Sequence, residues 1–234
     1  MPSLSVILPA YNEARRLPQS LAQLRTALQP WGEVEVIVVD DGSTDSTLEV
    51  AMRAGARVLP LSPNAGKGWA VREGMLLARG DRRLLCDVDL STPPDQLDKL
   101  WKTLDGGAQV AIGSRSLPSS EVRRHQPWYR EGMGRSFNRM VQHTVLPGFI
   151  DTQCGFKLFD GPSADAIFRR LKVRRFAFDV EVLVIAAALG YRVEEVPVAW
   201  EDHPASSVGI VKDSAKMLLD LGAIVWRKSQ GGYP

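Results

Sequence analysis

Short apolar runs alternate along the chain with segments of helical periodicity. The apolar runs fall at residues 4–8, 34–39, 57–61, 84–88 and 109–113. Between the first two runs, the leucines at 17, 21, 24 and 28 recur at helical spacing, which places them on one face of a helix over residues 13–29. Strands that alternate with amphipathic helices are typical of a parallel sheet covered by helices on both faces. The pattern therefore predicts an α/β fold with a mixed, mostly parallel central sheet flanked by helices.

Helix-start signals follow the first two apolar runs. We expect Asn12 to cap the first helix, with Pro18 in its first turns, where the missing amide proton costs least. Ser43 or Thr44 is expected to cap the second helix in the same way, through a side-chain oxygen.

The second half of the chain is less regular. Residues 116–127 lack periodicity and carry Pro, Ser and Arg, which favours a mobile loop. The remaining elements are predicted as helices at 129–145, 163–171, 179–189 and 210–227, strands at 155–159 and 192–200, and a polar loop at 201–209. Residues 229–234 are expected to fray.

Composition excludes several classes of protein. With 44% hydrophobic and 24% charged residues, the chain of 234 residues is neither disordered nor fibrous. A net charge of +2 gives no bulk attraction to nucleic acid, so we expect no nucleic-acid partner. Only Cys86 and Cys154 are present, which gives no disulfide framework and favours a reducing cytoplasm. The longest apolar run, 182–189, is too short to span a bilayer.

Two aspartates, Asp87 and Asp89, come at the end of the fourth apolar run. Side chains at i and i+2 of a strand point the same way, so both carboxylates can reach one hard cation. Mg²⁺ or Mn²⁺ held there would offset the charge of a departing diphosphate. A pair of solvated turn acids is the alternative, because this spacing alone is a weak signal.

Polar motifs also follow the first three apolar runs. They are PAYNE at 9–13, DDGSTD at 40–45 and NAGKG at 64–68. Each has a structural explanation of its own: Asn12 and Ser43 as caps, Asp40 and Asp41 as turn formers, and Lys67 as a solvated charge. Open α/β sheets bind ligands at the carboxyl edge of their strands. Because all the motifs fall at that edge, we expect a ligand site there.

In this order, PAYNE, VVDDGSTD, NAGKG and DVD resemble the motifs of the family-two glycosyltransferases, which have the GT-A fold. Further motifs are similar to those of the polyprenyl- and dolichyl-phosphate sugar synthases: GSR at 113–115, WYR at 128–130, DTQCGFKLF at 151–159 and AFDVE at 177–181. The last two are most similar to the dolichyl-phosphate glucosyltransferase branch. The resemblance covers about residues 3–227. It implies one Rossmann-like GT-A domain at 1–227, with a nucleotide-sugar half at about 1–115, an acceptor half at about 116–227, and a tail at 228–234.

The resemblance also implies roles for individual residues. Contacts to the base and ribose of a nucleotide are implied for Pro9, Tyr11, Glu13 and Asp41, with Lys67 near the nucleotide. The metal and the diphosphate are implied to be held by Asp87 and Asp89. An acceptor phosphate is implied to be gripped by Arg115 and Arg130, and the sugar to be faced by Asp151 and Gln153. Asp89, Arg115, Arg130 and Asp151 are thus the expected catalytic residues. Guanidinium groups suit phosphate because they bind its oxygens in a bidentate manner. The alternative for Arg115 and Arg130 is that each is a solubilising surface charge. For Asp179 and Glu181 two roles stay open: a place in the site, or capping of the helix that they begin.

The implied activity is inverting transfer of a hexose to a polyprenyl or dolichyl phosphate. The similarity to the glucosyl branch implies glucose as the hexose and UDP-glucose as the donor. A phosphate monoester is ionised near neutral pH, so it can attack without a general base. Users of GDP-mannose share most of these motifs, and mannosyl transfer stays an alternative. A soluble family-two enzyme acting on a sugar hydroxyl would need Asp151 or Asp179 as base. A noncatalytic nucleotide-sugar sensor is the remaining alternative, and the intact D-x-D pair argues against it.

Two features depart from the family pattern. A Gly-Ser-Lys-like signature is replaced by Ala205, Ser206, Ser207 and Val208, and Lys212 is the candidate substitute for the missing lysine. Many relatives also append transmembrane helices, whereas this sequence offers one amphipathic helix. We therefore expect peripheral contact with the cytoplasmic face of a membrane, with Arg123 and Arg124 facing anionic headgroups. The sequence carries no signal for the oligomeric state.

Overall fold

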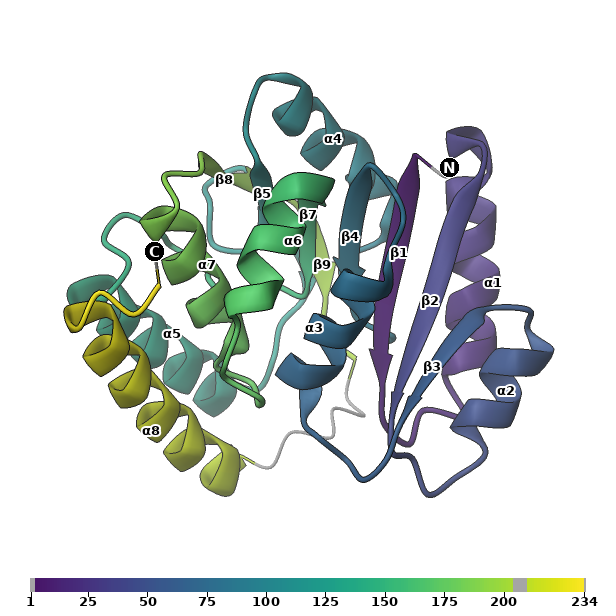
Figure 1. Ribbon diagram of the computed structural model, residues 1–234, viewed down its shortest axis with the longest axis horizontal. Helices are drawn as coiled ribbons and strands as arrows, with labels where there is room; N and C mark the ends of the chain where they lie inside the picture. The colour runs from purple at the N-terminus through teal and green to yellow at the C-terminus, as the bar shows by residue number, and fades with distance from the viewer. Residues whose placement is uncertain (1–2, 204–209, 234) are drawn as a thin grey trace.

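A seven-stranded sheet forms the centre of the computed structural model, which describes residues 3–203 and 210–233 (Figure 1). Its strands are β1 (Leu4–Ala10), β2 (Val34–Asp41), β3 (Arg57–Leu61), β4 (Arg82–Cys86), β5 (Val110–Ser114), β7 (Phe156–Asp160) and β8 (Val193–Pro197). Their order across the sheet is β3-β2-β1-β4-β7-β5-β8, and only β7 runs antiparallel to its neighbours. The predicted mixed, mostly parallel sheet is confirmed.

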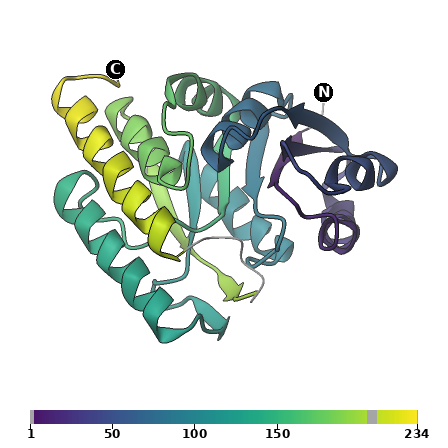
Figure 2. The ribbon, with the colours of Figure 1, turned by 90° about the horizontal axis from the view of Figure 1, so that it is seen from below.

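Helices cover both faces of this sheet (Figures 1 and 2). They are α1 (Leu17–Leu28), α2 (Thr47–Arg53), α3 (Lys67–Leu77), α4 (Leu97–Asp105), α5 (Trp128–Thr144), α6 (Gly161–Arg170), α7 (Phe178–Ala188) and α8 (Ile210–Ser229), with short 3-10 turns η1 (Gln29–Trp31) and η2 (Pro94–Gln96). One core lies under α1, α2 and α4, and the other under α3 and α5 to α8. Strand β1 feeds both cores because its side chains alternate: Val6 and Leu8 enter the first and Ile7 the second.

The four helical leucines predicted from the periodicity of α1 are all buried in the first core. Each contributes about 1.5 to 3 kcal/mol relative to an exposed side chain. Pro18 lies in the first turn, as predicted, but the helix begins at Leu17 and its start carries no side-chain cap.

The two loops expected to supply helix caps bind each other instead. Asn12 has a positive φ of 54°, and its Oδ1 accepts a hydrogen bond from the Thr44 amide at 2.8 Å. Ser43 Oγ accepts from the Asn12 amide at 2.9 Å, and Asp45 accepts from the amide of Thr47, where α2 begins. The predicted caps were therefore wrong, because these polar groups join the ends of β1 and β2.

The antiparallel strand β7 brings a distant motif to the end of β4. Phe156 pairs with Cys86, and the Asp87 amide donates to the Gly155 carbonyl at 3.2 Å. A Cβ atom on Gly155 would overlap the Asp87 carboxylate. The glycine of the DTQCGF motif therefore makes room for the first aspartate of the D-x-D pair.

Three predictions for the second half need correction. The expected loop at 116–127 contains β6 (Glu121–Arg124), which pairs in parallel with β9 (Ala199–Glu201). The single strand expected at 192–200 is divided at Val198, where the chain leaves the main sheet for this small one. Residues 229–233, the described part of the segment expected to fray, are held in place: Tyr233 is buried against the second core and its hydroxyl donates to Glu181.

The segment at Ala205 to Val208 and the side chain of Lys212 lie outside the described residues, so the expected lysine substitute has no structural account. No described helix is both long and apolar enough to cross a bilayer.

Candidate active site

Three cavities lie along the carboxyl edge of the sheet and share side chains. The β1–β2 cavity, of about 400 Å³, is lined by Pro9, Tyr11, Glu13, Asp41, Lys67, Asp87 and Asp89, among others. The central cavity, of about 270 Å³, shares Lys67 and both D-x-D aspartates with it. The arginine cavity, of about 510 Å³, shares Arg115 and Gln153 with the central one and is lined also by Arg130. The structure thus brings all the predicted site residues except Asp151 to the walls of one continuous cleft.

Asp41 holds the NAGKG turn against the end of β2. Its two carboxylate oxygens accept from the amides of Ala65 and Gly66 at 2.7 and 3.0 Å. Burial raises the pKa of Asp41, although these two hydrogen bonds act in the opposite direction. The side chain predicted to contact a nucleotide is thus used at least in part to shape the turn that carries Lys67.

Lys67 links the NAGKG turn to the D-x-D pair. Its Nζ lies 2.7 Å from Asp87 Oδ1, and both side chains are half-buried. Burial alone would lower the pKa of Lys67, but the carboxylates of Asp87 and Asp179 outweigh it and raise the pKa. Lys67 is therefore a fixed positive charge at the boundary between the two cavities.

Acidic side chains gather in the β1–β2 cavity. Asp89 accepts a hydrogen bond from the Ser91 amide at 3.0 Å, which fixes the second D-x-D carboxylate. Burial raises the pKa of Glu13, Arg16 opposes the change, and the charges of Asp89, Asp45 and Asp87 add to it. The carboxylates are thus close enough to repel one another, and a divalent cation would relieve that repulsion.

The donor set fits Mg²⁺ or Mn²⁺ bound together with a substrate. Among the described residues, no group of three or more His, Cys, Asp or Glu side chains forms a metal cage. Mg²⁺ is usually held by one or two carboxylates plus substrate phosphates and water. Asp87 and Asp89 supply that number of carboxylates at the mouth of a cavity large enough for a phosphate-bearing ligand.

The central cavity contains buried charges that sequence reasoning missed or left open. Asp179 lines it and pairs with Lys157, whose Nζ lies 2.5 Å from Asp179 Oδ1 and also donates to the Cys154 carbonyl. Burial raises the pKa of Asp179, and Lys157 opposes the change. Helix α7 has no side-chain cap, so neither Asp179 nor Glu181 serves as one. The ion pair joins residues 22 positions apart and left no local signal in the sequence.

Asp202 is a further missed residue of this cavity. It was assigned to a polar loop, yet it is buried and accepts a hydrogen bond from Gln126 at 3.3 Å. A polar pair, Asp202 and His203, directly after a strand is the signal that could have found it.

The arginine cavity is lined mainly by one side of α5. Arg130, Arg135 and Arg139 reach it from that helix. The Nε atom of Arg130 is buried and has no hydrogen-bond partner among the described residues. Arg72 and Arg83 also have an unpaired buried Nε, but each is paired with an acid through Nη1. At Arg130, which lines a cavity with other arginines, an anionic ligand would supply the missing acceptor.

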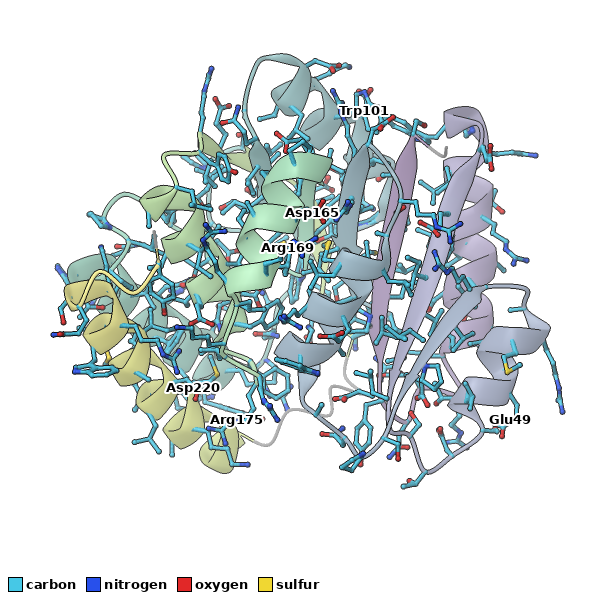
Figure 3. The ribbon with its side chains drawn as sticks, viewed as in Figure 1. Glu49, Trp101, Asp165, Arg169, Arg175 and Asp220 are labelled. Atoms are coloured by element: carbon cyan, nitrogen blue, oxygen red, sulfur yellow. The ribbon has the colours of Figure 1, made fainter. Side chains whose placement is uncertain are left out.

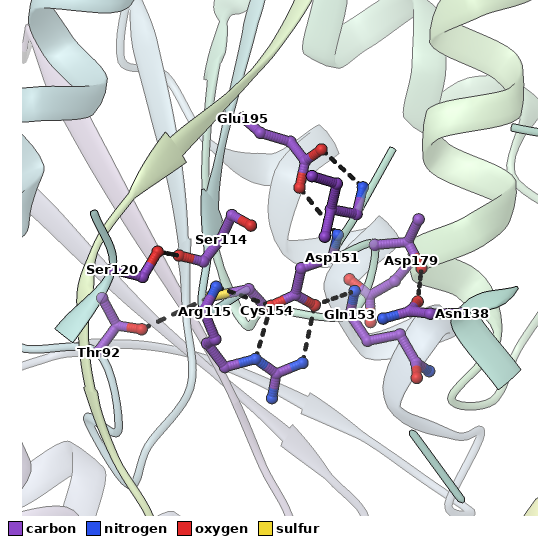
Figure 4. Close-up of polar contacts among 12 residues, drawn as sticks. Thr92, Ser114, Arg115, Ser120, Asn138, Asp151, Gln153, Cys154, Asp179 and Glu195 are labelled. Atoms are coloured by element: carbon purple, nitrogen blue, oxygen red, sulfur yellow. Dashed lines mark hydrogen bonds and ion pairs between the residues drawn. The ribbon is translucent and has the colours of Figure 1, made fainter. Parts of the chain in front are cut away.

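Asp151 does not face a sugar, and this expectation is corrected by the structure. The residue is fully buried and lines none of the three cavities. Its carboxylate holds the Arg115 guanidinium in a fork, with Nε to Oδ2 at 2.7 Å and Nη2 to Oδ1 at 2.8 Å (Figure 4). Glu195 in turn accepts from the Asp151 amide at 2.8 Å. Asp151 is therefore the support that orients Arg115 at the cleft.

The charge of Arg115 also sets the protonation of Asp151. Burial alone would raise the pKa of Asp151, but the guanidinium outweighs it and holds the pKa below its ordinary value. A carboxylate of lowered pKa, with both oxygens engaged, is a poor general base.

The model of glycosyl transferase family 2 matches residues 5–168. The dolichyl-phosphate beta-glucosyltransferase of Drosophila melanogaster is 40% identical over 226 residues, covering 88% of this chain and 69% of the relative. The human protein of the same name is 36% identical with the same coverage of both chains, and that of Saccharomyces cerevisiae is 32% identical, covering 93% of this chain and 72% of the relative.

Solved structures share the fold at lower identity. Mannosyl-3-phosphoglycerate synthase from Rubrobacter xylanophilus matches with a TM-score of 0.74 and 18% identity, covering 97% of this chain and 74% of that one. Glucosyl-3-phosphoglycerate synthase from Mycobacterium tuberculosis, in complex with Mn²⁺, UDP and phosphoglyceric acid, matches with a TM-score of 0.71 and 20% identity, covering 95% and 78%. These likenesses confirm the GT-A fold.

Replacing Asp151 tests its role as a support. Asp151→Asn keeps the shape but leaves Arg115 without its charged acceptor, so we expect a loss of about 2 to 3 kcal/mol in the free energy of unfolding at neutral pH, together with reduced activity. The difference from wild type should shrink as pH falls through the lowered folded-state pKa of Asp151, because the wild-type carboxyl is then neutral too. Urea unfolding at several pH values measures the loss of stability and its dependence on pH.

Asp98→Asn is the matched control, because Asp98 forms only an exposed pair with Lys102 on α4. It should change stability little. Equal stabilities of the Asp151→Asn and wild-type proteins would contradict the assignment.

Proposed function

The chain belongs to glycosyl transferase family 2 and is a glycosyltransferase, and from this premise we propose that it transfers glucose from UDP-glucose, with inversion, to a polyprenyl phosphate of the dolichyl type. One observation carries the proposal. A continuous cleft has carboxylates that suit a metal-bound diphosphate at one end and arginines that suit a second phosphate at the other.

The donor assignment is supported by the β1–β2 cavity. It collects Pro9, Tyr11, Glu13 and Asp41 beside Lys67 and the D-x-D pair, in the order that the family motifs imply. The relatives are named glucosyltransferases, and a structural neighbour binds UDP and Mn²⁺. Mg²⁺ or Mn²⁺ held by Asp87 and Asp89 would offset the charge that develops on the leaving nucleoside diphosphate. Lys67 would add a second positive charge on the same side.

The acceptor assignment is supported by the arginine cavity and by the ion pairs that engage Asp151 and Asp179, the two candidate bases that the sequence indicated. Arg130 offers a buried, unpaired N–H, and Asp151 holds Arg115 at the boundary with the central cavity. A sugar hydroxyl would need proton removal, yet Asp151 is locked by Arg115 and Asp179 by Lys157. A phosphate monoester needs no such base, and the named relatives act on dolichyl phosphate.

The proposed chemical step moves no proton. An oxygen of the acceptor phosphate attacks the anomeric carbon, a new carbon–oxygen bond forms, and the bond from that carbon to the diphosphate oxygen breaks. Attack from the face opposite the leaving group converts an α-linked donor into a β-linked product. The residues of the chain contribute by holding the two phosphate-bearing substrates in line and by compensating their charges.

A lipid acceptor requires contact with a membrane, and α5 suits that contact. One side of the helix lines the arginine cavity, while Trp128, Tyr129, Met133 and Met140 are exposed along it. Helix α8 lies beside α5 (Figures 1 and 2) and exposes Leu218, Leu219 and Trp226. We call these seven side chains the apolar α5–α8 face.

Cations border this face, as expected for binding to anionic lipids. Lys228 is exposed at the end of α8, and Arg124 is exposed on the neighbouring β6. The described cysteines, Cys86 and Cys154, are both buried and unpaired by a disulfide, which fits a reducing, cytoplasmic side of the membrane.

The proposed reaction is tested by offering UDP-glucose or GDP-mannose with Mn²⁺ and a short polyprenyl phosphate, with the lipid product detected by mass. We expect a hexosyl lipid phosphate from UDP-glucose and none when a chelator is present. Product from GDP-mannose alone would move the assignment to mannosyl transfer. Transfer only to a sugar-alcohol acceptor would overturn the phosphate acceptor, and donor binding without any transfer would favour a sensor.

Membrane contact is tested by flotation with vesicles of phosphatidylcholine and phosphatidylserine. Leu219 and Trp226 are 72% and 65% exposed, so replacing both with Ser should leave the fold intact and weaken vesicle binding roughly ten-fold or more. Transfer to a short, water-soluble polyprenyl phosphate should not change. Met52→Ser is the control, because Met52 is 62% exposed on α2, away from this face. Vesicle binding that is unaffected by the double substitution would contradict the α5–α8 assignment.

A further inference from the structure

A fully buried carboxylate, Glu181, lies in the first turn of α7 but lines none of the cavities. One of its oxygens accepts from the amides of Lys172 and Val173, at 2.8 and 2.5 Å. The other accepts from Arg227 Nη1 at 2.9 Å and from the Tyr233 hydroxyl at 2.7 Å. Glu181 thus joins the segment before α7, which we call the 172–176 segment, to the end of α8 and to the residues after it.

The 172–176 segment is a wall of the β1–β2 cavity and the seat of the NAGKG turn. Arg175 and Phe176 line that cavity. A Cβ atom on Gly66 would come within 2.5 Å of the Arg174 carbonyl oxygen, and one on Gly68 within 2.6 Å of the Val173 carbonyl oxygen. The two glycines of this turn are therefore required because the segment is packed directly against them, on either side of Lys67.

A second set of contacts runs parallel to the first. The Trp69 amide is shared between the Gly66 carbonyl at 2.9 Å and the Arg174 carbonyl at 3.2 Å, and the Arg174 guanidinium lies over the Trp69 ring at 4.7 Å. On the other side, Arg175 pairs with Asp220 of α8 at 3.1 Å (Figure 3). The segment is thus held between α8 and the start of α3, and a displacement of one would be transmitted to the other.

We propose that Glu181 and Tyr233 are positioning residues for the nucleotide-sugar site. Glu181 ties Tyr233 to the 172–176 segment, and this segment sets the place of the turn that presents Lys67 to Asp87. The inference rests on the proposed function for the identity of the ligand, but the coupling itself is a property of the free protein.

Tyr233→Phe removes only the hydroxyl that donates to Glu181. We expect the dissociation constant of UDP, measured with Mn²⁺, to rise about three- to ten-fold, with a matching rise in the KM for the donor and little change in kcat or in the KM for the acceptor. In the free protein, the Trp69 amide should exchange with solvent faster than in wild type, because one of its two acceptors, the Arg174 carbonyl, lies in the loosened segment and the other, the Gly66 carbonyl, lies in the turn packed against that segment. Native-state hydrogen exchange followed by mass spectrometry of peptides spanning 66–77 measures this.

Tyr191→Phe is the matched control, since it removes a tyrosine hydroxyl elsewhere in the same core and should change neither quantity. Arg227→Lys keeps a cation beside Glu181 and should lie between Tyr233→Phe and wild type. A role confined to stability would lower the melting temperature of Tyr233→Phe while leaving Trp69 exchange and the UDP affinity unchanged well below that temperature, and this result would overturn the proposal. If wild type bound no nucleotide, the proposed function would fail, and the exchange of Trp69 would still decide the coupling.

Discussion

Charge separation along one cleft is the constraint on which the rest of the site depends. Asp87 and Asp89 stand at the end of β4, and their charges add to the effect of burial in raising the pKa of the neighbouring Glu13. Compensating cations stabilise such a group of acids. Lys67 compensates Asp87 and Arg16 compensates Glu13, and a divalent cation bound with the diphosphate would add further positive charge. At the far end the cavity is lined by several arginines, and the buried Nε of Arg130 has no hydrogen-bond partner in the described part of the chain. A site polarised in this way suits the joining of two phosphate-bearing substrates and does not suit a neutral acceptor.

The fold creates this polarity by bringing distant segments to one sheet edge. Strands β1, β2 and β4 end there with the donor-side motifs, and the antiparallel strand β7 inserts Gly155 beside Asp87. Its motif also carries Asp151, whose buried carboxylate orients Arg115 between the central and arginine cavities. A single stretch of chain, residues 151–155, therefore contacts both Asp87 and Arg115.

Local geometry let the sequence predict that the motifs after β1, β2 and β4 come together at one edge of the sheet. The alternation of apolar runs located the sheet, and the i, i+2 spacing of Asp87 and Asp89 predicted two carboxylates on one side of a strand end. The failures concern contacts between distant residues. Nothing near Asp151 indicates that its partner is Arg115, 36 residues earlier, and nothing near Tyr233 indicates that it is buried against Glu181. Polar residues that serve each other across the fold look the same in sequence as polar residues that face a ligand.

The central claim is that arginines grip an acceptor phosphate without contributing to donor binding, and the Arg130→Ala protein tests it most directly. Its transfer of glucose to a short polyprenyl phosphate is measured beside its affinity for UDP-glucose, with Arg53→Ala, an exposed arginine of α2, as control. The account predicts a loss of transfer of roughly ten- to a hundred-fold, corresponding to about 1.5 to 3 kcal/mol for a charged hydrogen bond, with donor affinity unchanged. Normal transfer, or a loss of donor affinity as large as the loss of transfer, would contradict it.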